Sequence, residues 1–139
     1  MAYVSLDSEQ IKKAHKKHKY NKIQVEQLEK CMDPKTRPLS FMETFMRIQH
    51  PTQGEMAFKP YPYQKRLIEA YNSHRFSVSM LPRQTGKTTC ASGYIIWYAM
   101  FHTDSQILIA AHKYAGASDI MSRVRYAYEM LPSWIKAGV

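Results

Sequence analysis

One short stretch constrains this chain more than any other, the sequence LPRQTGKTT at residues 81–89. It follows an alternating apolar run over residues 76–80 and precedes a long helix-forming run over residues 88–101. A strand, a tight loop and a helix N-terminus in that order aim backbone N–H groups at an anion. The order of these three elements predicts a phosphate-binding loop before the long helix.

Three residues of this loop have the chemistry that a nucleoside triphosphate requires. Gly86 permits a phosphate to approach the backbone closely. Lys87 places a point charge on the β- and γ-phosphates, and the Thr88 hydroxyl suits a Mg²⁺ ion. The loop departs from the usual pattern at its start, where Leu81 stands in place of a glycine. The alternative is an ordinary strand-to-helix turn with a surface lysine.

Hydrophobic periodicity predicts the elements around the loop. Residues 75–81 are expected to form a first strand, and the continuous apolar run 107–111 is typical of a parallel strand covered on both faces. Helices are predicted over residues 62–71, 88–101 and 117–131. This order is a βαβ unit of an α/β protein, with a right-handed crossover. Because two strands cannot form an independent parallel sheet, we expect the opening of a larger nucleotide-binding domain.

Residues 1–56 are expected to be a separate segment, helical and basic. A helix predicted over residues 7–31 begins at a capping-box pattern and carries a basic run over residues 12–22. Prolines break the chain at 33–38, and a short amphipathic helix is predicted over 39–49. The basic run is either a solvated helix face or an arm that binds nucleic acid or an acidic partner.

Charge and composition narrow the class of partner. The chain has 139 residues, with 20 lysines and arginines against 11 acidic residues, for a net charge of +9. This balance favours polyanions such as nucleic acid, a nucleotide or an acidic protein. No apolar run has the length of a membrane span and no secretory segment opens the chain, so an intracellular protein without a membrane partner is expected. Cys31 and Cys90 lack metal or disulfide spacing and are predicted to be reduced and structural.

Residues 57–139 resemble the start of the ATPase domain of the large terminase subunit of T4-like tailed bacteriophages. The resemblance covers about 60% of the chain, and residues 1–56 match only in being helical and basic. An ordered set of motifs carries it: Tyr63-Gln64 upstream of the loop, Arg83-Gln84 followed by Gly86-Lys87-Thr88-Thr89, then Ile109-Ala110-Ala111-His112-Lys113, and Glu129-Met130-Leu131-Pro132.

This resemblance implies a motor that uses ATP and Mg²⁺ to package double-stranded DNA into a procapsid. The partners that it implies are the DNA, the portal protein, the small terminase subunit and the remainder of the large terminase. The implied location is the host cytoplasm, with transient attachment at the portal vertex of the procapsid. The implied fold is an incomplete P-loop NTPase, with the first βαβ unit of a parallel-sheet ATPase core in residues 57–139.

The resemblance also assigns roles to individual residues. Lys87 and Arg83 are the implied catalytic residues, with Arg83 as an arginine finger in cis that stabilises charge on the transferred phosphoryl group. Gln64 is implied to read the adenine edge, Tyr63 to pack beside the base, and Thr88 to bind Mg²⁺. The plainer alternatives are that Arg83 is an ordinary loop charge, that Gln64 faces solvent and that Tyr63 packs in the core. For Thr88, the alternative is a residue of the helix N-terminus that binds no metal. The implied nucleotide-binding set is Tyr63, Gln64, Pro82, Arg83, Gln84, Thr85, Gly86, Lys87, Thr88 and Thr89.

The acidic residues depart from the family pattern. A working ATPase needs an acidic pair after an apolar strand to hold Mg²⁺ and activate water, and none follows residues 107–111. Asp104 does not follow a predicted strand, while Asp119 and Glu129 lie in the last predicted helix. The acidic cluster of a nuclease is not present either. We therefore interpret the chain as an N-terminal piece of a large terminase and expect no ATP turnover from it alone.

Two other hypotheses stay open on the sequence. A helicase-like P-loop ATPase would share the upstream Gln64 with the packaging motor. A basic remnant that binds DNA or protein without catalysis would use the run over residues 12–22, with a vestigial loop. Neighbouring capsid or portal genes would favour the packaging motor over the helicase. DNA binding that does not change when Lys87 is replaced would favour the non-catalytic remnant.

Overall fold

The computed structural model describes residues 19–50, 52 and 54–136. Within them the chain is mixed α/β, with five helices and one two-stranded antiparallel sheet. The elements in chain order are α1 (Lys22–Met32), α2 (Leu39–Phe45), β1 (Arg47–His50), β2 (Gly54–Ala57), α3 (Pro62–Ser73), α4 (Lys87–Phe101) and α5 (Tyr114–Glu129).

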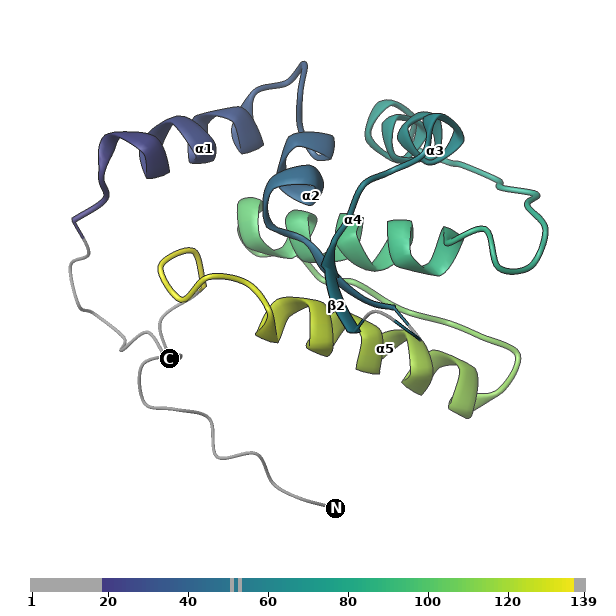
Figure 1. Ribbon diagram of the computed structural model, residues 1–139. Helices are drawn as coiled ribbons and strands as arrows, with labels where there is room; N and C mark the ends of the chain where they lie inside the picture. The colour runs from purple at the N-terminus through teal and green to yellow at the C-terminus, as the bar shows by residue number, and fades with distance from the viewer. Residues whose placement is uncertain (1–18, 51, 53, 137–139) are drawn as a thin grey trace.

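Helix α4 lies in the middle of the molecule. It packs between α3 and α5, and α2 also contacts it (Figure 1). The sequence of α4 explains this position, because apolar residues surround it on almost every side and such a helix is stable only when it is covered. Cys90, Gly93, Ile96 and Trp97 are buried, although Ala99 is exposed. The predicted helix over 88–101 is confirmed and begins one residue earlier.

Trp97 joins this central helix to the N-terminal part of the described chain. Its side chain is 1% exposed, and its indole N–H donates a hydrogen bond of 3.0 Å to the carbonyl of Cys31 at the end of α1. Phe101 and Phe41 complete an aromatic cluster around it, with ring centroids 5.8 Å apart. The core therefore spans both segments that the sequence analysis separated at residue 56.

The helix predicted over residues 39–49 is wrong in its second half. Helix α2 ends at Phe45, and β1 then pairs with β2 in a hairpin in which Ile48 stands opposite Met56. After α2 the side chains alternate between the core and solvent, which is the period of a strand rather than of a helix. Gly54, at a φ of 72°, begins the returning strand in a conformation that glycine adopts without strain.

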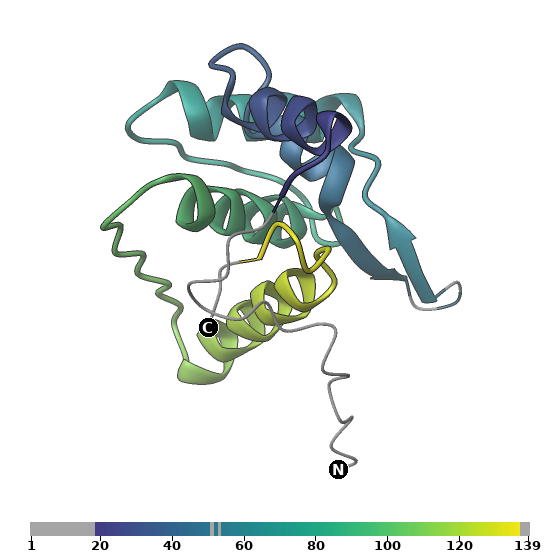
Figure 2. The same ribbon diagram turned by 90° about the vertical axis from the view of Figure 1, so that its left-hand side faces the viewer.

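The two predicted parallel strands are not paired in this structure. Neither residues 75–81 nor residues 107–111 belong to a strand, and the described residues contain no parallel sheet. Figure 2 shows that both segments run as open chain beside the helices. A strand requires a hydrogen-bonded neighbour, and neither segment finds one among the described residues. Their apolar side chains stay in solvent: Phe76, Val78, Met80 and Leu108 are 81%, 94%, 93% and 91% exposed.

The first helix of the described chain begins at Lys22. The side-chain oxygen of Asn21 accepts a hydrogen bond of 2.8 Å from the backbone N–H of Gln24. The side-chain oxygen of Gln24 accepts one of 3.0 Å from the backbone N–H of Asn21, which completes a capping box. The helix predicted over 7–31 is therefore wrong for residues 19–21. Its predicted start and the lysines before residue 19 lie outside the described residues. In the described ranges, no helix has the length and apolar character that a membrane span needs.

Replacing Trp97 with phenylalanine is expected to lower the free energy of unfolding by about 2–3 kcal/mol. The change leaves the buried carbonyl of Cys31 without its donor and leaves part of the indole volume empty. Denaturant titration would measure it. Trp134→Phe, at a partly buried ring, is the matched control and should cost less. Equal losses for both variants would contradict this role of Trp97.

The two cysteines are expected to resist thiol reagents in the folded protein. Both are unbridged and buried, and burial raises the pKa of the Cys31 thiol to about 12 and of the Cys90 thiol to about 11, from an ordinary 9.0. Both thiols should react slowly at pH 8 and rapidly in denaturant. Each thiol has a higher pKa in the folded chain than in the unfolded chain. Its contribution to the free energy of unfolding is therefore complete below pH 9 and is lost as the pH rises towards 11–12. Rapid reaction of either thiol with the reagent in the folded protein would contradict the burial of the cysteines.

Candidate functional site

The loop before α4 is bent by two residues in the left-handed conformation. Gly86, which caps the helix, has a φ of 74°, and Gln84 has a φ of 63°. A Cβ on Gly86 would lie 2.6 Å from Nε2 of Gln64, closer than real contacts allow. Position 86 therefore requires glycine for its conformation and for its lack of a side chain.

Two side chains at the start of α3 hold this loop in place. The Tyr63 hydroxyl donates a hydrogen bond of 2.9 Å to the Thr85 carbonyl, and Nε2 of Gln64 donates one of 3.0 Å to the same oxygen. Oε1 of Gln64 accepts a bond of 2.9 Å from the backbone N–H of Tyr61. The structure thus brings both predicted site residues to the loop, where they bind its backbone.

The ammonium group of Lys87 lies over the carbonyls of the loop. Nζ donates hydrogen bonds of 3.0 Å to the Leu81 carbonyl and 3.5 Å to the Pro82 carbonyl. The Thr85 hydroxyl donates to the Pro82 carbonyl at 3.0 Å, which closes the turn from within. The loop therefore has its cation at the N-terminus of α4, where unpaired backbone N–H groups and the helix dipole also attract an anion.

The remaining loop residues face solvent to different degrees. Pro82, Arg83 and Gln84 are exposed, and Thr88 is half-buried in the first turn of α4. Within the described ranges, no three His, Cys, Asp or Glu side chains gather in a way that could hold a metal ion. The Thr88 hydroxyl lies next to Lys87 at the start of α4, the position at which a phosphate-binding loop provides a hydroxyl ligand for Mg²⁺.

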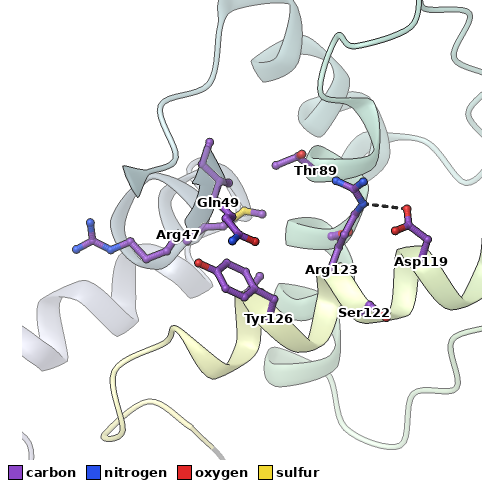
Figure 3. Close-up of a pocket in the computed structure, with 11 residues that line it drawn as sticks. Arg47, Gln49, Thr89, Asp119, Ser122, Arg123 and Tyr126 are labelled. Atoms are coloured by element: carbon purple, nitrogen blue, oxygen red, sulfur yellow. Dashed lines mark hydrogen bonds and ion pairs between the residues drawn. The ribbon is translucent and has the colours of Figure 1, made fainter. Parts of the chain in front are cut away.

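A cavity of about 330 Å³ opens further along α4, between β1, α4 and α5. Thr89 contributes from α4, Gln49 from β1, and Arg123 and Tyr126 from α5 (Figure 3). Of these four residues, only Thr89 belongs to the nucleotide-binding set expected from the sequence. Gln49 and the two α5 residues come from elements far apart in the chain, and no local pattern joins them.

The polar side chains of this cavity differ in whether they have a hydrogen-bond partner. Nε of Arg123 donates a hydrogen bond of 3.1 Å to Oδ2 of Asp119, which sets the guanidinium below Thr89 in Figure 3. In Figure 3 the carboxamide of Gln49 lies above the ring of Tyr126, whose hydroxyl is directed to the side of Arg47. Ser92 is 1% exposed, and its hydroxyl finds no hydrogen-bond partner among the residues that the structure describes.

A scan against protein-family models finds none that matches this chain. The loop presents a cation, a helix N-terminus and a backbone that only glycine permits, which together suit a phosphate group. The cavity presents hydrogen-bonding side chains and an aromatic ring, which suit a polar organic group.

Replacing Gly86 with alanine is expected to lower the free energy of unfolding by about 2–5 kcal/mol. The cost combines left-handed strain with the conflict against Gln64. Gly54→Ala is the matched control, because its φ of 72° is nearly the same and no atom lies within 4 Å of its added Cβ. We expect about 1–2 kcal/mol there, from strain alone. Denaturant titration would compare them, and equal costs would contradict the tight packing of Gln64.

Proposed function

We propose that this chain is the ATP-binding part of the large terminase subunit of a T4-like tailed bacteriophage, a motor that packages double-stranded DNA. One observation carries the proposal: the left-handed bend at Gly86 delivers the N-terminus of α4 and the ammonium of Lys87 to the same loop. A triphosphate needs backbone N–H donors and a compact cation together. The motif set around the loop connects this chemistry to the terminase family.

In the proposed complex, the phosphates bind at the loop between Pro82 and Lys87. The Lys87 ammonium now shares two carbonyls of the loop and would turn to the β- and γ-phosphates, which are stronger partners for a cation. The Thr88 hydroxyl would be the protein ligand of Mg²⁺, which supplies charge neutralisation between the phosphates. Arg83 is exposed beside the loop and would reach the terminal phosphate as a second cation.

We further propose that residues 75–81 and 107–111 are strands of a parallel sheet in a complete P-loop domain. The observation in support is that both segments expose large apolar side chains, while a sheet covered by helices would bury them. An apolar groove between α4 and α5, lined by Ile95, Ala99 and Met121, offers a further surface for such a sheet. The additional strands would belong to the remainder of the large terminase.

The proposed activity of this chain is nucleotide binding without turnover. Hydrolysis requires an acidic pair to hold Mg²⁺ and to position water. Asp119 is already paired with Arg123 on α5, and Glu129 ends that helix. The remainder of the large terminase would supply the acidic pair, and the DNA, the portal protein and the small subunit would be partners of the assembled motor.

Replacing Lys87 with alanine is expected to weaken ATP binding in the presence of Mg²⁺ at least tenfold. The substitution removes the ammonium group that the carbonyl of Leu81 holds in the loop, and with it the cation that would bind the phosphates. Isothermal titration calorimetry would measure it on the full chain. Lys30→Ala, an exposed lysine at the end of α1, removes the same charge away from the loop and should leave the affinity unchanged.

Two results would contradict the proposal. The first is ATP binding that is as tight in Lys87→Ala as in the unaltered chain. The second is an equal loss in Lys30→Ala, which would indicate attraction by net charge alone. ATP hydrolysis that depends on Lys87 would instead contradict only the expected lack of turnover.

A further inference from the structure

The cavity between β1, α4 and α5 lies against one edge of the hairpin. Four consecutive residues line it on this side: Met46, Arg47, Ile48 and Gln49. Successive side chains of a strand point to opposite faces, so a cavity that meets all four lies beside the edge of the strand and not under one face. Among the described residues, none from β2 lines the cavity. Figure 2 accordingly shows β1 on the side of the hairpin that faces α5.

The backbone of β1 has unpaired groups at this edge. The carbonyl of Met46 accepts a hydrogen bond of 3.0 Å from the N–H of Phe58, which continues the register of the hairpin. Antiparallel pairs alternate between hydrogen-bonded and non-hydrogen-bonded, so Ile48 is bonded to β2, whereas Arg47 and Gln49 direct their N–H and C=O groups away from it. Within the described part of the chain, no backbone hydrogen bond outside the hairpin reaches these groups. Such an edge is a template for another extended chain.

The side chains around the cavity favour an acidic group. Two arginines line it, Arg47 and Arg123, against one aspartate, Asp119. Arg47 extends to Glu55 at 3.8 Å, and Nε of Arg123 bonds Asp119, which leaves the terminal nitrogens of Arg123 as further donors. Ser92, which is 1% exposed, also lines the cavity, and its hydroxyl has no hydrogen-bond partner among the described residues. A buried polar group of this kind is stabilised by a ligand that reaches it.

We propose that this groove binds an extended peptide segment of a partner protein, with an acidic side chain in the cavity. The peptide adds a strand to the free edge of β1 and bonds the backbone of Arg47 and Gln49. Its carboxylate accepts hydrogen bonds from the guanidinium of Arg123 and the hydroxyl of Ser92. The net charge of +9 repels a second copy of this chain and attracts an acidic partner. The groove requires no nucleotide at the loop, so this inference goes beyond the proposed function.

The first test asks which peptides the full chain selects. Random displayed peptides of roughly seven residues, enough to span β1, are selected for binding. We expect Asp or Glu at one shared position. A synthetic peptide of the selected sequence is then titrated by fluorescence anisotropy. Arg123→Gln should bind it about tenfold more weakly, and that difference should vanish when the acid of the peptide is replaced by its amide. Arg125→Gln is the matched control, because Arg125 lies on α5 but does not line this cavity.

The second test isolates the backbone of β1. Gln49→Pro removes the N–H at the free edge without removing a bond of the hairpin, and Gln49→Ala removes the same carboxamide but keeps that N–H. We expect the proline variant to bind the peptide about tenfold more weakly than the alanine variant. N-methylation of the peptide requires no protein variant. Because alternate N–H groups of an added strand face β1, methylating one alternate set should abolish binding and methylating the other should leave it unchanged.

Four results would overturn the inference. They are a selection that yields no peptides or no shared acidic position, equal binding of the acidic peptide by Arg123→Gln and the unaltered chain, and equal effects of the two methylated sets. The fourth is a dimer of the unaltered chain in analytical ultracentrifugation that becomes a monomer in Gln49→Pro, which would assign the edge to a second copy. Failure of the chain to bind ATP would contradict only the proposed function.

Discussion

The left-handed turn at Gly86, packed against Gln64, is the constraint on which the rest of this structure depends. It ends the open segment that follows α3 and starts α4 at a fixed angle. Because α4 is the central helix of the core, that angle also sets where α3 and α5 can pack. A larger residue at position 86 would disturb the loop and the core at the same point, because both depend on the conformation of this one residue.

The loop is tied to the core on both sides of this turn. Tyr63 and Gln64 hold the Thr85 carbonyl from the start of α3, and at the other end of α3 the Tyr94 hydroxyl of α4 donates a hydrogen bond of 3.1 Å to the Tyr71 carbonyl. These bonds are part-buried, where water competes less and each bond contributes more. The two helices thus form a frame that holds the loop in its position at the start of α4.

Local patterns predicted the loop and its helix, and they failed where the structure is made by distant contacts. Gly86 and the apolar run after it act within a few residues, so α4 could be read from the sequence. The end of α2 at Phe45 depends on pairing with β2, and the alternation of residues 46–49 was read as part of a helix. The strands at 75–81 and 107–111 follow from local apolar patterns, but a strand also needs a partner strand to pair with. Gln49 and Arg123 line the same cavity only because of tertiary packing, so no sequence signal could join them.

In the function that we propose, the unpaired segment 75–81 would link nucleotide binding to the completion of a sheet. Burying one large apolar side chain contributes about 1.5–3 kcal/mol, and Phe76, Val78 and Met80 are each more than 80% exposed. A strand that pairs with this segment would therefore bind with several kcal/mol of apolar burial and would fix the chain that leads into Leu81 and Pro82. Those carbonyls hold Lys87. Because coupling between two sites is reciprocal, a nucleotide that orders the loop should in turn strengthen the pairing of that strand.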